Sequence, residues 1–310
     1  MADFSAQEQA IESGALVLPR PDLGTLIVTG GERQSWLAGM LTADIAPLRA
    51  GQGAYALAVN KTGRIQAEVW MALDADRVLL GVEKDLLEPL REHLDHYLIM
   101  EDAEVAPSEE TSSWWLAHGP ASEVVVRVAR EQGAVASLAR LGELDTAIVV
   151  APQDPRFSEA LLSAPGAVLA TPDGWERVRI ARMLPRFGVD FAAGNFPQEA
   201  TLEHLAVSFN KGCYLGQEAV FMLEKRGHVN KRLVRLAFDG VVPAVAKDSE
   251  VRTLEGDVVG AVTSATRVGD RTMAIAMVRY KHTLSGTVLE VAGERAEVSC
   301  LATREGEACS

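Results

Sequence analysis

The residues KGCYLGQE at 211–218 decide how this chain is interpreted, because they place a cysteine, a lysine, a glutamine and a glutamate around two glycines. Lys211 lies two residues before Cys213 and predicts an ammonium group near the sulfur. Gly212 removes side-chain bulk where we expect the backbone to turn. A helix that opens at 216–218 adds the positive potential of its N-terminus. These features favour the thiolate form of Cys213.

A thiolate at this position has several chemical uses. It attacks an electrophile, ligates iron or enters sulfur exchange, while the amide of Gln217 orients a bound amide or ring edge. The alternative is that Cys213 is a small buried hydrophobic residue in a turn. The residues alone leave both interpretations open.

The motif K-G-C-Y-x-G-Q-E is similar to the signature of the YgfZ family, a branch of the T-protein aminomethyltransferase superfamily. The resemblance covers roughly residues 15–300, because further stretches follow the superfamily pattern. They are VTGGERQSWLAGMLTADI at 28–45, which carries an L-T-x-D element, AVNKTGRI at 58–65, HYLIMEDAEV at 96–105, RIARMLPRFGVDF at 179–191 and GAVTSA at 260–265.

The resemblance implies an α+β fold with two interlocked α+β domains of the aminomethyltransferase folate-binding type over residues 1–228. A C-terminal β-barrel domain follows over residues 229–310. In this family the parts form a ring around a central hole that holds tetrahydrofolate, either free or in a one-carbon-substituted form. Members of the group support the synthesis or repair of iron-sulfur enzymes. We therefore expect a monomeric accessory protein whose partners are folate and iron-sulfur client proteins.

The resemblance also assigns roles to single residues of the motif. Cys213 and Lys211 are expected to form the reactive site. The positions expected to contact folate are Gly212, Tyr214, Gly216, Gln217 and Glu218.

Two positions depart from the aminomethyltransferases. The Asp-Asp pair of their hairpin is Ala67-Glu68 here, and the glutamate of their R-I-E-A-G pattern is Ala181. Both changes argue against glycine-cleavage activity and leave the mode of folate binding open. Glu68 is one methylene longer than aspartate, and small displacements of a reacting group are costly. Ala181 removes the acceptor that the family glutamate offers to the amino groups of the pterin. If the chain is instead a tetrahydrofolate-dependent one-carbon transferase acting on a small amine, Glu68 is its acid–base group. Equally open are a Glu68 on the solvated side of an amphipathic strand and a binding module that keeps only the scaffold.

Three arginines lie close to Ala181 in the sequence. Arg179, Arg182 and Arg186 are spaced by three and four residues, which places them on one face of a helix. In one interpretation this face binds the glutamate tail of folate through bidentate donors, chiefly Arg179 and Arg186. In the other, all three form a solvated face.

The sequence does not predict a metal site. His93 and His96 form an H-x-x-H pair, but no third ligand is placed near them. The three cysteines, Cys213, Cys300 and Cys309, contain no C-x-x-C spacing and cannot all pair with one another, so at least one thiol is free. Cys300 and Cys309 are expected in or after the last strand.

The composition limits the partners of the chain. Its 310 residues carry a formal net charge of -13, which opposes binding to nucleic acids or anionic membranes. The N-terminus lacks the pattern of a signal peptide, and no apolar stretch approaches the roughly 20 residues that span a bilayer. We therefore expect a cytoplasmic protein with no nucleic-acid and no membrane partner.

Hydrophobic periodicity predicts the local elements. The expected strands are 25–28, 54–59, 64–73, 114–116, 147–150 and 168–169, and the expected helices are 32–41, 89–98, 122–130, 157–162 and 219–223. In the hairpin at 54–73, the second strand alternates apolar and polar residues. After residue 230, short strands separated by turn residues predict the barrel.

Overall fold

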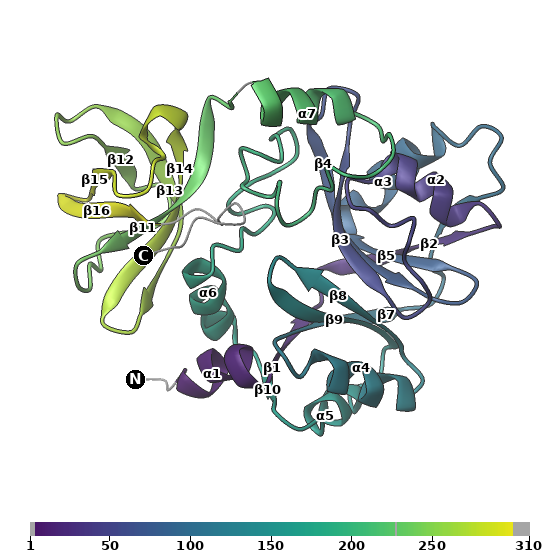
Figure 1. Cartoon of the computed structure of the whole chain (residues 1–310). Helices are drawn as coiled ribbons and strands as arrows, with labels where there is room; N and C mark the ends of the chain where they lie inside the picture. Colours follow the sequence, from purple (N-terminus) through teal and green to yellow (C-terminus); the bar gives the residue numbers. More distant parts are fainter. Residues whose placement is uncertain (1–3, 227, 300–310) are drawn as a thin grey trace. The chain divides into compact units, whose positions relative to one another are not determined.

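The computed structural model describes residues 4–226 and 228–299, which form two compact units (Figure 1). The first unit consists of the residues up to Lys61, Gln66–Gly174 and Leu205–Gln217. The second consists of Thr62–Ile65, Trp175–His204 and the residues from Glu218 onward. The polypeptide passes between the units several times, so neither unit is one continuous segment.

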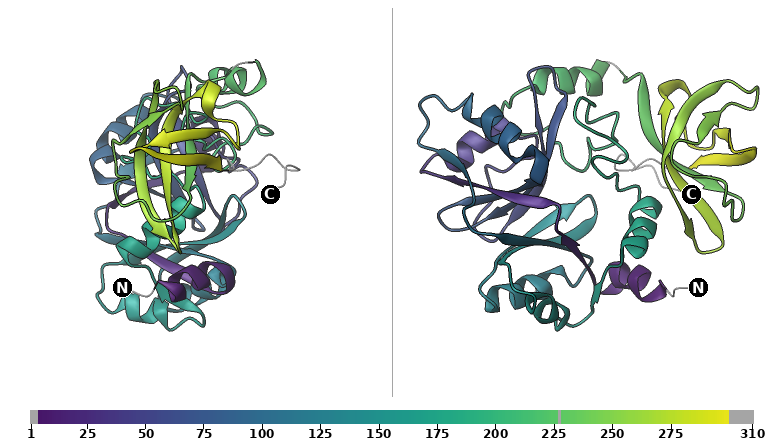
Figure 2. Two further views of the ribbon diagram at one scale, coloured as in Figure 1. Left: turned by 90° about the vertical axis from the view of Figure 1, so that its left-hand side faces the viewer. Right: turned by 180° about the vertical axis from the view of Figure 1, so that it is seen from behind.

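The first unit contains two five-stranded sheets, of which one has the order β10-β1-β7-β9-β8. Strand β1 runs parallel to β10 and antiparallel to β7. The strands are β1 (Ala15–Arg20), β7 (Ser112–His118), β8 (Val135–Leu141), β9 (Leu144–Pro152) and β10 (Ala167–Leu169), and helix α1 (Ser5–Ser13) precedes them. Helices α4 (Ser122–Glu131) and α5 (Phe157–Leu162) cover one face (Figure 2), where Val125, Val126 and Leu161 enter the shared core.

The second sheet of this unit has the order β3-β4-β5-β2-β6. Its strands are β2 (Leu23–Thr29), β3 (Gly53–Val59), β4 (Ile65–Leu73), β5 (Val78–Glu83) and β6 (Glu104–Pro107). Helices α2 (Arg33–Met40) and α3 (Leu87–Asp95), the latter preceded by a 3₁₀ turn at Lys84–Leu86, cover one face. Leu37, Met40, Leu90 and Leu94 join the strands in one core.

The two sheets interlock, because the chain begins in one with β1, builds the other with β2–β6 and returns with β7. Their facing sides are joined by Trp114 of β7, whose indole N–H donates to the hydroxyl of Thr25 at 2.8 Å. Strand β4 is therefore buried on both sides, and its polar-side residues Glu68 and Trp70 are only 6% and 5% exposed. Of the two alternatives left open for Glu68, the solvated side of an amphipathic strand is therefore wrong, since the other sheet covers this side.

The second unit contains a closed barrel with the strand order β11-β14-β13-β12-β15-β16. The strands are β11 (Lys231–Phe238), β12 (Glu250–Arg252), β13 (Val258–Val268), β14 (Arg271–Arg279), β15 (Val288–Val291) and β16 (Glu294–Ser299), with a 3₁₀ turn at Tyr280–His282. Helix α6 (Pro172–Ala181) leads into this unit, and α7 (Gln217–Arg226) precedes β11. Val234, Leu236, Val262 and Ala276 are among the residues of the barrel core.

Most of the predicted elements are confirmed. The hairpin is β3 and β4, the helices at 32–41, 122–130 and 157–162 are α2, α4 and α5, and the barrel follows residue 230. Helix α3 spans Leu87–Asp95 instead of 89–98. The strands β1, β5, β6, β8, β12 and β16 were not among the predicted elements, and Cys300 and Cys309 lie outside the described residues.

Candidate functional site

Residues 205–217, which include most of the motif, belong to the first unit. We call this segment the motif loop. It is bonded to the L-T-x-D element through Thr42, which is fully buried and donates its hydroxyl to the carbonyl of Ala206 at 2.6 Å. The amide of Ser208 donates to the Thr42 carbonyl at 2.9 Å, and the amide of Leu215 to the Gly39 carbonyl at 2.9 Å. Two stretches that carry the family resemblance, far apart in sequence, therefore meet here.

Lys211 fixes the motif loop to the end of helix α2. Its ammonium donates to the carbonyls of Ala38, Leu41 and Ala43, each at 2.7 Å. Carbonyls at a helix C-terminus lack intrahelical donors, so the lysine satisfies them. Burial lowers the pKa of Lys211 to about 8, and the charge of Asp44 opposes this shift. We call this arrangement the Lys211 cap.

The Lys211 cap differs from the predicted pairing of lysine and sulfur. An ammonium group has three N–H donors, and the three carbonyls use all of them. None remains to hydrogen-bond a thiolate at Cys213. The structure therefore gives Lys211 a positioning role in the loop that carries the thiol.

Cys213 is exposed at the surface of the motif loop. The alternative of a small buried hydrophobic residue is therefore wrong. Gly212 is also exposed, and a Cβ added to it would meet no atom within 4 Å, so the predicted steric reason for this glycine is wrong as well. The loop presents a thiol that a reagent or partner reaches from solvent.

The residues after the cysteine connect the loop to helix α7. Tyr214 is 6% exposed, with its ring centre 5.1 Å from the Lys211 ammonium. Burial raises the pKa of the Tyr214 hydroxyl, which has no hydrogen-bond partner among the described residues. Gly216 has φ of 76°, a left-handed conformation that favours glycine, and α7 begins at the next residue, Gln217. Glu218 lies exposed in the first turn, where a carboxylate is favoured.

Glu68 lies elsewhere in the first unit, at the centre of a buried polar cluster. Its carboxylate accepts hydrogen bonds from the hydroxyl of Tyr55 at 3.1 Å, the indole of Trp70 at 3.2 Å and the guanidinium of Arg20 at 3.3 Å. Burial, followed by the charge of Glu68, raises the pKa of Tyr55 well above its usual value. Arg20 belongs to one sheet and Glu68 to the other, so the cluster joins the two sheets.

His118 borders the Glu68 cluster in the first unit. Its ring lies 6.5 Å from that of Trp70, and its Nδ1 lies 3.0 Å from the hydroxyl of Thr146. Burial, and to a lesser extent the charge of Arg20, lowers the pKa of His118 to about 3. The imidazole is therefore neutral at physiological pH.

Arg179 is buried in a second polar cluster, which belongs to the second unit. It donates to Glu176 at 2.7 and 2.5 Å, to Asp190 at 2.7 Å and to Ser264 at 2.7 Å. Asp190 also accepts from the hydroxyls of Thr263 and Ser264, both at 2.6 Å. We call these residues the Asp190 cluster. It joins the stretches 179–191 and 260–265, which were both part of the family resemblance.

The predicted arginine face is wrong. Helix α6 ends at Ala181, so Arg186 does not continue the helical face of Arg179. Arg179 is 1% exposed and its donors are engaged within the protein. The guanidinium of Arg186 is 59% exposed and lies 3.5 Å from Glu176, so it remains accessible.

The histidine pair lies beside an aromatic ring. His93 and His96 both contact Tyr97 edge to face, with ring centres 5.5 and 4.9 Å apart. Over residues 4–226 and 228–299, no three or more His, Cys, Asp or Glu side chains gather closely enough to hold a metal ion. Across the same residues, no helix has both the length and the apolar character needed to span a membrane.

Several structural residues of these clusters were not predicted from the sequence. Thr42 and Asp190 lie within the quoted stretches, where the L-T-x-D and R-F-G-V-D-F patterns were the available signals. Arg20 and Tyr55 carried no signal, because their contacts with Glu68 arise from the packing of two sheets.

Comparisons with known proteins extend these observations, although no family model matches the chain. The chain is 24% identical over 277 residues to the tRNA-modifying protein YgfZ of Aliivibrio fischeri, covering 83% of this chain and 82% of that protein. It is 24% identical over 303 residues to YgfZ of Yersinia pseudotuberculosis, covering 93% and 92%. It is 26% identical over 250 residues to the mitochondrial iron-sulfur cluster assembly factor IBA57 of Mus musculus, covering 76% and 67%.

The structural comparison concerns the fold. The crystal structure of aminomethyltransferase T of the glycine cleavage system from Bartonella henselae matches with a TM-score of 0.78 and 19% identity, over 96% of this chain and 89% of that one. The resemblance predicted from the motif is thereby confirmed: the chain has the fold of the glycine-cleavage T-protein, and its curated relatives include YgfZ proteins and an iron-sulfur cluster assembly factor.

Proposed function

We propose that this chain is an accessory protein for iron-sulfur enzymes, that Cys213 is its reactive group and that it binds tetrahydrofolate. The observation that carries the proposal is an exposed thiol on a loop that the Lys211 cap and Thr42 hold in place. The names of the relatives support it, since one is an iron-sulfur cluster assembly factor and others are tRNA-modifying proteins. Both names fit one role if the clients are iron-sulfur enzymes that modify tRNA.

The thiol acts in this proposal as an iron ligand. After Cys213 loses its proton to solvent, the sulfur donates an electron pair to an iron ion of the client's cluster. A ligand of that iron leaves as the new bond forms, so the exchange requires no change of oxidation state. An exposed cysteine on an anchored loop suits such an exchange, because the sulfur is accessible and its direction is fixed.

The fit to a reduced folate is partial. The buried hydroxyl of Tyr214, which lacks a partner among the described residues, is a polar atom that a ligand would satisfy. Arg179 does not fit the predicted contact with the glutamate tail, because the Asp190 cluster uses its donors. Folate binding is therefore proposed from the fold and Tyr214, and no chemical step of the proposal runs through folate.

The transferase alternative required an accessible acid–base group at Glu68. That carboxylate is buried and accepts hydrogen bonds from Arg20, Tyr55 and Trp70. Its contacts join two sheets of the first unit. The structure therefore does not favour a one-carbon transferase with Glu68 as the acid–base group.

The role of Cys213 is tested in cells that lack this chain. They are complemented with wild type, Cys213→Ser or a control, Lys281→Met, which removes an exposed charge in the second unit. Wild type and control are expected to restore iron-sulfur enzyme activity and the tRNA nucleosides that depend on it, measured by mass spectrometry. Cys213→Ser is isosteric but lacks the soft sulfur ligand, and full restoration by it would disprove the role of the thiol.

Folate binding is tested separately by calorimetry with tetrahydrofolate. Tyr214→Phe keeps the ring and removes the hydroxyl, so affinity is expected to fall about fivefold, as for the loss of about 1 kcal/mol of hydrogen bonding. Cys213→Ser is expected to bind as wild type does. Absence of any binding to wild type would remove folate from the proposal and leave the thiol role standing.

A further inference from the structure

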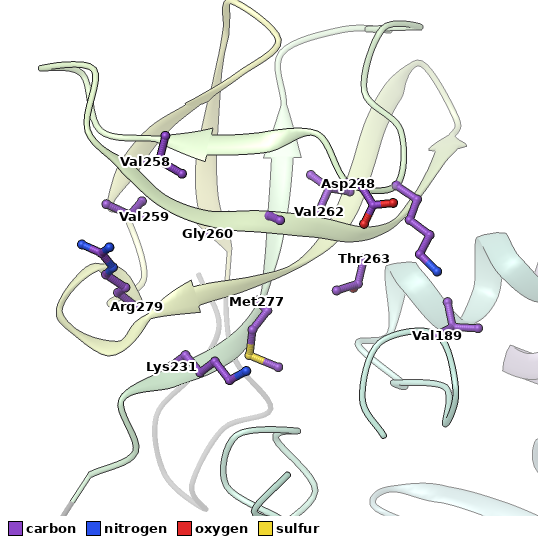
Figure 3. A pocket seen from close by; sticks show the side chains of 12 residues that line it. Val189, Lys231, Asp248, Val258, Val259, Gly260, Val262, Thr263, Met277 and Arg279 are labelled. Carbon is purple, nitrogen blue, oxygen red and sulfur yellow. The ribbon is translucent and has the colours of Figure 1, made fainter. Parts of the chain in front are cut away.

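A groove of about 440 Å³ lies on the second unit, along strand β13 of the barrel (Figure 3). Its apolar floor includes Val258 and Val262 of β13 and Met277 of β14. In the close-up, the side chains of Lys231 and Met277 lie beside each other, Arg279 lies farther along the groove, and Val189 forms the opposite wall. No part of the proposed function uses this groove.

The groove is cationic in a chain that is acidic overall. Lys231, Lys247 and Arg279 line it together with a single carboxylate, Asp248, whereas the whole chain has a net charge of -13. All three cations are exposed, and within the part of the chain that the structure describes no ion pair engages any of them. Unpaired cations gathered over an apolar floor attract an anion and retain its apolar portion.

Contacts within the second unit fix the walls of the groove. Val189 precedes Asp190, and the hydroxyl of Thr263, another lining residue, donates to Asp190 at 2.6 Å. A Cβ on Gly260 would lie 2.2 Å from the carbonyl oxygen of Met277, so only glycine allows this close approach of β13 and β14. The amide of Asp248 donates to the Val262 carbonyl at 2.8 Å, which holds the loop that carries Lys247. The hollow is therefore present before a ligand binds.

We infer that this groove binds a small dianion with an apolar body, such as a phosphate monoester or a dicarboxylate. Three cations and one carboxylate give the groove a net charge of +2, which a dianion neutralises. The valine and methionine side chains cover an apolar ring or chain next to the anionic group. Asp248 accepts a hydrogen bond from an N–H or O–H of the ligand, which adds selectivity.

Calorimetry tests the inference with three probes: phenyl phosphate, phthalate and inorganic phosphate. Phenyl phosphate or phthalate is expected to bind more tightly than inorganic phosphate, because the ring covers the apolar floor. The tighter of the two identifies the class of anion. If neither ring-bearing probe binds, or if inorganic phosphate binds equally well, the inference is overturned.

Variants locate the binding in the groove. Lys231→Met, Lys247→Met and Arg279→Met are each expected to weaken the better probe about fivefold, as for about 1 kcal/mol per charged contact. Arg295→Met removes an exposed charge from β16 outside the groove and is the matched control. Equal weakening by this control would show diffuse charge attraction and reject the site.

Asp248→Asn supplies a test with the opposite sign. Asparagine tolerates the φ of 68° at this position, so the loop keeps its conformation. Removing the only carboxylate of the groove lowers repulsion, and the affinity for inorganic phosphate, which gains nothing from the apolar floor, is expected to rise severalfold. Unchanged or lower affinity, with an unchanged melting temperature, would contradict an anion site here.

Discussion

At the scale of single residues, the position of Cys213 depends on Lys211, which lies two residues before it. Lys211 donates its three N–H groups to the end of helix α2, and these contacts set the course of the loop before the cysteine. The motif thus places an exposed thiol two positions after the residue that holds its loop.

We predict that Lys211→Met destabilises the protein by about 2 kcal/mol, because three partly buried carbonyls lose their donor. Urea denaturation followed by circular dichroism measures the change. The thiol of Cys213 should also react faster with an alkylating reagent, since the loop is less constrained. Lys281→Met, which removes an exposed lysine of the barrel unit, serves as the control and should change neither quantity.

His118 predicts a dependence of stability on pH. Its pKa is about 3 in the folded protein and about 6.5 in the unfolded chain, so between these values only the unfolded chain binds the proton. The free energy of unfolding should therefore fall as pH decreases from 6.5, by up to about 1.4 kcal/mol per pH unit.

Urea denaturation at pH values of about 7, 5.5 and 4.5 compares wild type with His118→Asn, which retains a polar group near Thr146. The variant should lose less stability on acidification. The exposed His96→Asn is the control and should follow wild type. Parallel profiles for wild type and His118→Asn would contradict a neutral buried His118.

At the scale of elements, the Asp190 cluster joins helix α6 and the turn after it to strand β13. Asp190 accepts from Arg179, Thr263 and Ser264, and also from the backbone amide of Arg186 at 2.9 Å. A single carboxylate therefore fixes three segments of the second unit. The same contacts define one wall of the proposed anion groove.

We predict that Asp190→Asn lowers the free energy of unfolding by about 3 kcal/mol, because it leaves the buried guanidinium of Arg179 without its buried counter-charge. Glu176→Gln removes the other partner of Arg179, which is 30% exposed, and should cost about 1 kcal/mol. Urea denaturation of both variants measures the two losses in the free energy of unfolding. Equal losses would show that burial of the partner does not determine its contribution.

Local patterns in the sequence were sufficient for the elements with a clear period or turn. The hairpin around residues 60–63 and the helices α2, α4 and α5 follow from apolar spacing and turn residues alone. The burial of Glu68 was not predictable in this way. An alternation of apolar and polar residues indicates one solvent-exposed side, but a second sheet covers that side of strand β4. For the same reason the partners of Lys211 and Arg179, and the exposure of Cys213, came only from the tertiary structure, whereas helix α7 was predicted from the motif.

At the scale of the whole molecule, the two compact units do not correspond to two continuous stretches of the sequence. The barrel begins at Lys231, close to the predicted boundary at 229, but its compact unit also contains Trp175–His204. Strand β11 depends on that segment, since the amide of Leu233 donates to the Glu199 carbonyl at 2.8 Å and the hydroxyl of Thr201 donates to the Leu233 carbonyl at 3.0 Å.

We predict that a fragment of residues 229–310 is largely unfolded, whereas a fragment of residues 175–310 retains the barrel. The shorter fragment lacks Asp190 and the partners of β11, so the barrel loses buried hydrogen bonds along two strands. Circular dichroism and thermal denaturation of both fragments measure the difference. A cooperative transition of equal midpoint in the two would show that the barrel is independent of the earlier segment.

The anchored motif loop has a consequence for kinetics under the proposed role of Cys213. A thiol on a flexible segment reaches its target through its own motion, whereas the loop here is held on both sides of Cys213, by the Lys211 ammonium and by the Leu215 amide. If iron exchange at this thiol is the function, a client has to bring its iron to the loop. The rate would then depend on the concentration and docking of the client more than on motion of the loop.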